Sequence, residues 1–95
     1  MKRYSILNNL DKCFFCGKTA ECIHEVYFGT ANRQISIKNG FCAGLCNKHH
    51  NISKNSVHNN RCMDLQLKKL YQEEYEKTHT RQDFINLIGK NYLDD

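Results

Sequence analysis

The sequence predicts a small α+β domain, in which two short strands lead into a turn of helix and two longer helices follow. Residues 21–28 (ECIHEVYF) and 41–45 (FCAGL) are rich in the β-branched, aromatic and apolar residues of strands. Two later segments carry apolar residues at helical spacing. A chain of 95 residues makes one domain, residues 1–95, whose modest core would benefit from an added staple.

The strands can be placed from their boundaries. Residues 1–12 are polar and mixed, and they offer a few apolar docking contacts: Tyr4, Ile6, Leu7 and Leu10. Gly29 ends the first strand, and residues 30–37 (TANRQISI) are expected to form a loop or a short turn of helix. The turn signal Asn39-Gly40 leads into the second strand. At Cys46 the chain should turn into a helix, and residues 51–60 should form a loop.

The C-terminal third predicts two packing helices. Residues 63–77 keep apolar side chains three and four apart, with charge on the other face: Leu67, Leu70, Tyr71 and Tyr75. Thr80, followed three residues later by Asp83, resembles an N-terminal capping arrangement. A second helix then runs to about Ile88, where Gly89 follows.

Six cysteines make the redox setting important. The first ten residues (MKRYSILNNL) contain no continuous apolar run, so we expect no signal peptide, and we expect no membrane span anywhere. In a reducing cytoplasm the cysteines should remain thiols. A metal ion is then a better staple than disulfides.

Two cysteine and histidine pairs have the spacing of zinc ligands. Cys13 and Cys16 are separated by two residues and followed by Gly17, as in a zinc knuckle; a redox motif would instead open a helix in a βαβ unit. Cys46 and His49, with the same spacing about thirty residues later, form the natural second pair. We therefore expect these four residues to bind a structural zinc ion, with His50 as an alternative to His49.

The remaining histidines predict a second site. If His49 binds zinc, His50 is left to join His24 and His58 around another divalent ion that clamps a phosphate or activates water. Glu25 adjoins His24 and could act as a general base. Of the other cysteines, Cys22 and Cys42 are interpreted as buried apolar residues and Cys62 has no assigned role.

Net positive charge is concentrated in residues 1–62, the part of the chain that contains the candidate ligands. Residues 1–62 contain nine basic and three acidic residues, a net charge of +6, whereas residues 63–95 contain five and seven, a net charge of −2. A basic surface around a metal site suits nucleic acid, although an ordinary solvated surface would show the same balance. Candidate phosphate contacts on DNA are Arg33, Lys48, Lys54 and Arg61.

Taken together, these residues resemble the HNH endonucleases, the ββα-metal nucleases. The zinc-bearing branch has CxxC, a dipeptide such as His-Glu ending the first strand, Leu-Cys-x-x-[Cys/His]-His opening the metal helix, and a later histidine. Here these correspond to Cys13-x-x-Cys16, His24-Glu25, residues 45–50 (LCNKHH) and His58. Residues 25–33 and 84–93 are also similar to small phage and prophage HNH proteins, so the resemblance spans about residues 12–93.

The resemblance implies a zinc-stabilised ββα-metal domain with two additional C-terminal helices, acting as a metal-dependent DNA endonuclease. It implies a bacterial host cytoplasm, a phage origin, and phage or host DNA-processing proteins as further partners. His24, His50 and His58 would bind the catalytic ion (Mg²⁺, Mn²⁺, Ni²⁺ or Zn²⁺). Glu25 would occupy the position of the general base.

Three features depart from the family pattern. Glu25 stands where a histidine is more usual, and adjacent residues of a regular strand point to opposite faces, so His24 could itself be the base while Glu25 orients it or binds the metal. No asparagine directly precedes Leu45-Cys46; Asn39 is close but out of register, and Asn32 is an alternative. His58 follows His50 by eight residues, so a loop must deliver it, and Asn60 could orient it or substitute for it.

Two other functions fit part of the sequence. The chain could be a non-catalytic zinc finger that binds nucleic acid or protein, or a zinc-stabilised phage adaptor whose acidic helices bind a host protein. Neither uses histidines beyond the four zinc ligands. His24, His50 and His58 therefore favour the nuclease.

Overall fold

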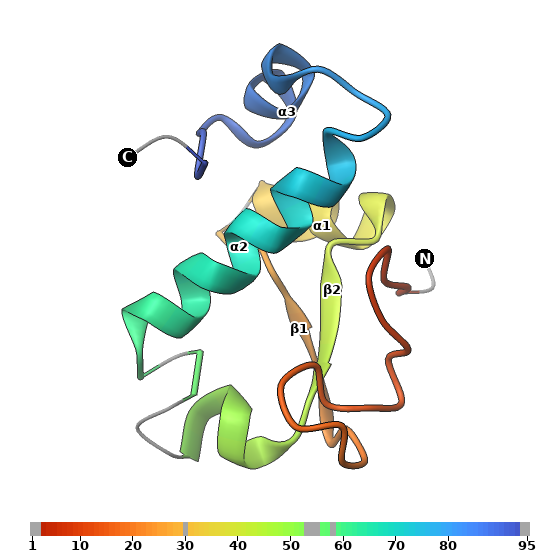
Figure 1. The fold of residues 1–95 in the computed structure, drawn as a ribbon, viewed down its shortest axis with the longest axis vertical. Helices are drawn as coiled ribbons and strands as arrows, with labels where there is room; N and C mark the ends of the chain where they lie inside the picture. The colour runs from red at the N-terminus through yellow and green to blue at the C-terminus, as the bar shows by residue number, and fades with distance from the viewer. Residues whose placement is uncertain (1–2, 30, 53–55, 58, 94–95) are drawn as a thin grey trace.

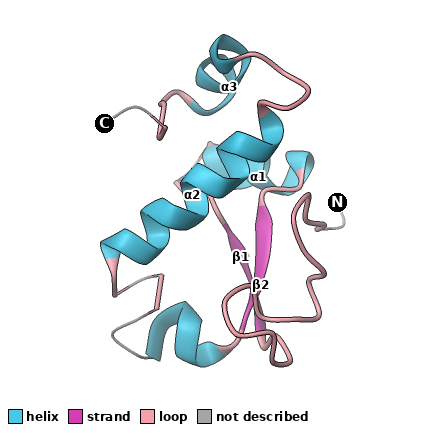
Figure 2. Cartoon of the chain, viewed as in Figure 1, coloured by secondary structure: helices cyan, strands magenta, loops and turns pink. Residues whose placement is uncertain are grey.

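The computed structural model describes residues 3–29, 31–52, 56–57 and 59–93. Its element order is β1 (Cys22–Glu25), α1 (Asn32–Asn39), β2 (Cys42–Leu45), the π-helical turn η1 (Lys48–Ile52), α2 (Arg61–Tyr75) and α3 (Arg81–Ile88). Figures 1 and 2 show the two strands at the centre, α2 running obliquely beside them and η1 directly after β2. The α+β class predicted from the sequence is therefore confirmed.

The sheet is one antiparallel pair, in which His24 lies opposite Ala43 and Glu25 lies opposite Cys42. The first strand is shorter than the predicted 21–28 and ends at Glu25. Val26 still donates its backbone N–H to Phe41 O, at 2.9 Å. The backbone of Tyr27, however, is bonded by the buried Ser36 hydroxyl, which accepts from Tyr27 N and donates to Tyr27 O. A side chain of α1 thus replaces the neighbouring strand, and regular pairing stops.

Helix α1 replaces most of the loop or short helical turn expected over residues 30–37. It is eight residues long and ends at Gly40, which has a left-handed backbone with φ of 76° and donates its N–H to Ser36 O. The helix contacts β1 and α3. The Asn39-Gly40 signal is thus a helix end, and the chain enters β2 directly after it.

The two C-terminal helices are confirmed, each with a defined start. Asn60 begins α2 by accepting the backbone N–H groups of Cys62 and Met63, so α2 starts two residues earlier than predicted. At α3, Thr80 and Asp83 form the expected reciprocal capping box. Among the described residues, no helix has both the length and the apolar character that crossing a membrane requires.

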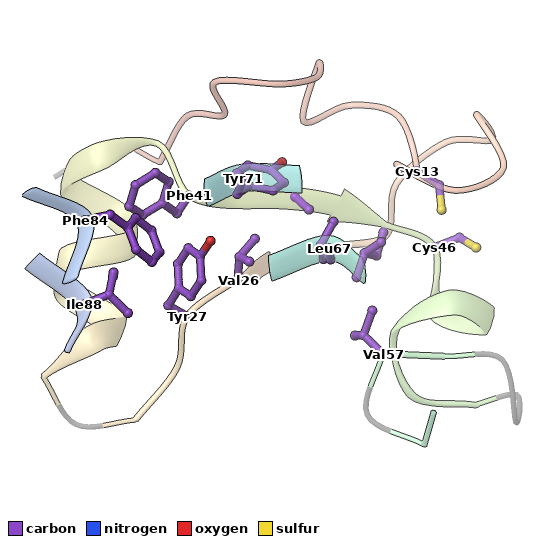
Figure 3. Close-up of a cluster of buried hydrophobic side chains, with 12 residues drawn as sticks. Cys13, Val26, Tyr27, Phe41, Cys46, Val57, Leu67, Tyr71, Phe84 and Ile88 are labelled. Carbon is purple, nitrogen blue, oxygen red and sulfur yellow. The ribbon is translucent and has the colours of Figure 1, made fainter. Parts of the chain in front are cut away.

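The core runs from an aromatic end to an end that contains Cys13 and Cys46, as Figure 3 shows. Phe41, Tyr27 and Phe84 pack edge to face or tilted at one end. Leu67 and Tyr71 of α2 continue the core along the sheet, and Cys13 and Cys46 lie at its other end, all of them buried. The thiols of Cys13 and Cys46 are therefore part of the same apolar core.

Gly44 allows the N-terminal segment to lie against β2. A Cβ atom built at this position would stand 2.7 Å from Lys12 O and closer still to Leu10 O. Phe14, which directly follows Cys13, donates its backbone N–H to Gly44 O at 2.8 Å. The close backbone approach that only glycine permits therefore helps to position the first cysteine pair.

We expect Gly44→Ala to destabilise the zinc-loaded domain by about 1–3 kcal/mol, the usual cost of forcing atoms into a packed region. Because the displaced backbone leads into Cys13, metal affinity should fall as well. Chemical denaturation with a competitive zinc chelator measures both quantities. A variant with wild-type stability and wild-type affinity would contradict the close approach.

Candidate metal centre and adjacent pocket

The first pair of ligands is shaped by a tight turn. Cys13 N donates to Lys18 O at 2.7 Å, and Gly17 N donates to Cys13 O at 2.9 Å. Gly17 has φ of 76°, a conformation that glycine adopts without strain. The turn thus brings the side chains of Cys13 and Cys16 to the same place, as the CxxC spacing predicts.

The second pair of ligands forms where β2 ends. The backbone N–H groups of His49 and His50 both bond to Cys46 O, at 3.1 and 3.0 Å, so the chain turns sharply at Cys46. The turn brings His49 Nδ1 to 3.3 Å from Cys46 Sγ and 3.6 Å from Cys13 Sγ. Within the described residues, the segment where a metal helix was expected forms the five-residue turn η1.

The four ligand atoms have the spacing of a metal site. They lie within 4.8 Å of one another, and Cys16 Sγ is 3.8 Å from Cys46 Sγ. At zinc bond lengths, a regular tetrahedron places two sulfurs about 3.8 Å apart and a sulfur and a nitrogen about 3.6 Å apart. Cys13, Cys16, Cys46 and His49 could therefore hold a metal ion, with distances consistent with structural zinc.

The electrostatics of the two knuckle thiols also suit a cation. Burial disfavours the Cys13 thiolate, but hydrogen bonds from the backbone of Cys46, Cys16 and Phe15 outweigh it and lower the Cys13 pKa to about 6. At Cys16 the backbone of Lys18 favours the thiolate, yet desolvation and the neighbouring sulfurs leave its pKa raised. A bound cation would relieve this crowding of negative charge.

The other three cysteines lie outside the cluster. Burial raises the pKa of Cys42 to about 11, and burial also raises the pKa of Cys22, whose thiol donates to Leu45 O. Cys42 is buried, in line with its interpretation from the sequence, whereas Cys22 is only partly buried. Cys62 is exposed at the start of α2.

His50 lies beside His24 and is not part of the thiol cluster. The centroids of the two imidazole rings are 5.5 Å apart. Both rings line a pocket of about 230 Å³ with four other residues: Ile23, Glu25, Phe28 and Arg33. The two consecutive histidines therefore lie at different sites: His49 belongs to the thiol cluster, and His50 lines this second pocket. We call the second pocket the histidine pocket.

The histidine pocket contains both His24 and Glu25 although they are strand neighbours. His24 is 4% exposed and points to the face that carries Ala43 and Leu45, whereas Glu25 points to the opposite face. Ile23, His24 and Glu25 are consecutive in β1, and all three line the pocket. The pocket therefore receives side chains from both faces of the strand, so His24 and Glu25 can share it.

Both oxygens of the Glu25 carboxylate are engaged by arginines. Arg3 Nε lies 3.2 Å from Oε2, and Arg33 Nε lies 3.4 Å from Oε1. The Glu25 side chain is 13% exposed, while that of Arg33 is 62% exposed. Glu25 therefore holds a guanidinium at the mouth of the histidine pocket. Sequence reasoning missed Arg3, because residues 1–12 offered no ligand pattern.

The predicted DNA contacts are dispersed. Arg33 lines the histidine pocket, Lys48 lines a separate hollow of about 640 Å³ beside the thiol cluster, and Arg61 is exposed at the start of α2. Two of the predicted residues, His58 and Lys54, lie outside the described residues. Their roles stay predictions.

The asparagines considered for the site have structural partners. Asn32 Nδ2 donates to Ile88 O, and Asn39 Nδ2 donates to Ile35 O. Asn60 caps α2. None of the three lines the histidine pocket, so an HNH-type asparagine is not among the pocket's lining residues.

Comparison with protein-family models, curated proteins and solved structures found no match.

Proposed function

We propose that the chain is a metal-dependent endonuclease of the HNH type that hydrolyses DNA phosphodiester bonds. In this proposal Cys13, Cys16, Cys46 and His49 bind a structural zinc ion, and the strands with η1 form a reduced ββα-metal core. The observation that carries the proposal is that the adjacent residues His49 and His50 lie at two different sites. His49 Nδ1 lies 3.3 Å from Cys46 Sγ, while the His50 ring lies 5.5 Å from that of His24.

His24 and His50 would bind the catalytic divalent ion, with His58 as the predicted third ligand. Imidazole nitrogens suit the later first-row metals. When bound, such an ion supplies charge stabilisation to a phosphate and its leaving oxygen. Burial of His24 keeps its ring in one place on β1, which fixes half of this ligand pair before an ion arrives.

Arg33 would bind the substrate phosphate. Its guanidinium is exposed at the pocket and is oriented from behind by Glu25. This arrangement supports a positioning role for Glu25, which orients the guanidinium that meets the phosphate. The alternative is that Glu25 leaves its arginines and acts as the general base.

We expect Glu25→Gln to weaken substrate binding by loosening Arg33, so that KM rises while the acid limb of the kcat–pH profile stays in place. Glu73→Gln, which removes an equal charge from an exposed position of α2, is the matched control. Steady-state kinetics across pH checks the result. If Glu25 is the base, kcat should instead fall by roughly 10²–10⁴-fold and the acid limb should shift.

The proposed activity is tested by incubating zinc-loaded protein with supercoiled plasmid and Mg²⁺, Mn²⁺, Ni²⁺ or additional Zn²⁺. Conversion to nicked or linear plasmid should require the added ion and an intact His50. An absence of conversion with every ion would contradict the nuclease and favour the zinc-finger alternative.

A further inference from the structure

The histidine pocket has an apolar wall as well as a polar one. Three large hydrophobic residues are exposed in the described part of the chain, and two of them, Phe28 at 49% and Ile23 at 42%, line this pocket. Exposed apolar surface is unfavourable in water, so its concentration beside His24, His50 and Arg33 indicates a ligand that is partly flat and apolar and partly anionic.

The Phe28 ring is held in place from behind. The ammonium group of Lys68 lies over the ring, 4.0 Å from its centroid. Lys68 is itself fixed: it is 5% exposed, pairs with Asp64 one helical turn away on α2, and accepts the Tyr27 hydroxyl at its backbone carbonyl. The centroids of the His24 and Phe28 rings are 6.1 Å apart, and the angle between the ring planes is 56°. A ring fixed in this way loses little freedom when something stacks on its exposed surface.

A nucleotide matches both walls of the pocket. Its base is flat and stacks on aromatic rings without sequence preference, and its phosphate suits Arg33 and an ion held by the histidines. In an intact duplex the bases stack on one another and only the backbone and groove edges are presented. Phe28 can therefore contact a base face only where the strand is unpaired.

We propose that Phe28 is a stacking platform for an unpaired base, so that the preferred substrate is single-stranded DNA or a duplex with an unpaired segment. Placement of this base beside the scissile phosphate rests on the proposed nuclease function. The stacking itself depends only on binding, and the two can be measured separately.

Binding is measured by fluorescence anisotropy, with zinc-loaded protein and no other added ion, on a labelled single strand and on a fully paired, blunt-ended duplex of matched length. Phe28→Ala should weaken single-strand binding by about 5- to 150-fold, the usual worth of one stacked base, and leave duplex binding unchanged. Phe28→Trp should retain affinity. Phe28→Leu keeps apolar bulk without an aromatic face and should behave like Phe28→Ala.

Tyr4→Ala is the matched control, because Tyr4 is 48% exposed and lies outside the histidine pocket. It should bind both probes as the wild type does. Equal losses on both probes, no loss with Phe28→Ala, or full affinity with Phe28→Leu would each overturn the platform.

Cleavage of single-stranded, mismatched and fully paired DNA by the same variants separates the two proposals. If no DNA is cut but single-strand binding still depends on an aromatic residue at position 28, the nuclease fails and the platform stands. If DNA is cut with no preference for unpaired segments, and Phe28→Ala changes nothing, the platform fails and the nuclease stands.

Discussion

Cys16→Ser is expected to leave the chain unfolded or without fixed tertiary packing at room temperature. Binding at a structural zinc site contributes about 10–16 kcal/mol to folding, whereas a small domain is stable by only about 5–15 kcal/mol in total. Loss of one of four ligands would forfeit much of that contribution in a chain with a modest core. Far-UV circular dichroism with metal analysis gives the result.

Cys62→Ser makes the same chemical change at an exposed cysteine outside the cluster, and it should keep its zinc and its melting temperature. A Cys16→Ser variant that folds fully without zinc would contradict a structural role for the site. Because Cys16 is exposed while Cys13 and Cys46 are buried, its substitution disturbs packing least and tests the metal most directly.

His50→Ala should lower plasmid cleavage by at least about 10²-fold while zinc content and melting temperature stay close to those of the wild type. An ion that stabilises phosphate charge is worth several kcal/mol, and each 1.36 kcal/mol changes the rate tenfold. The His50 ring faces His24 and is absent from the thiol cluster, so its loss should spare the zinc.

His79→Ala is the control for His50→Ala. His79 is exposed and stacks on Tyr75, with ring centroids 3.9 Å apart. Its replacement by alanine should have no effect on cleavage. If His50→Ala instead loses its zinc, then His50 and not His49 is the fourth structural ligand, and the assignments of the two histidines must be exchanged.

The convergence of the four candidate metal ligands could be predicted from the sequence because the two residues of each pair lie close together in the chain. Two residues separate Cys13 from Cys16 and Cys46 from His49, so short turns alone aim each pair at one point. Only the meeting of the two turns is tertiary, and a chain of this size leaves few other partners for them. The C-terminal helices were equally accessible, because their apolar spacing and the Thr80 cap are local signals.

The histidine pocket was only partly accessible from the sequence. His24, Glu25, His50 and Arg33 stand out by residue type, but the ion pair between Glu25 and Arg3 joins positions 22 residues apart along an N-terminal segment without periodicity. Helix α1 was obscured for a related reason. Its buried Ser36 is polar and bonds the backbone of Tyr27, so the local sequence shows no apolar helical face.

Metal stoichiometry tests the two-site account most directly. After dialysis, the wild-type chain should retain one zinc and bind one further, exchangeable Mn²⁺ or Ni²⁺. His50→Ala should retain the zinc and lose the exchangeable ion. A wild-type chain that retains one zinc and binds no second ion would contradict the account and leave a zinc-finger module in its place.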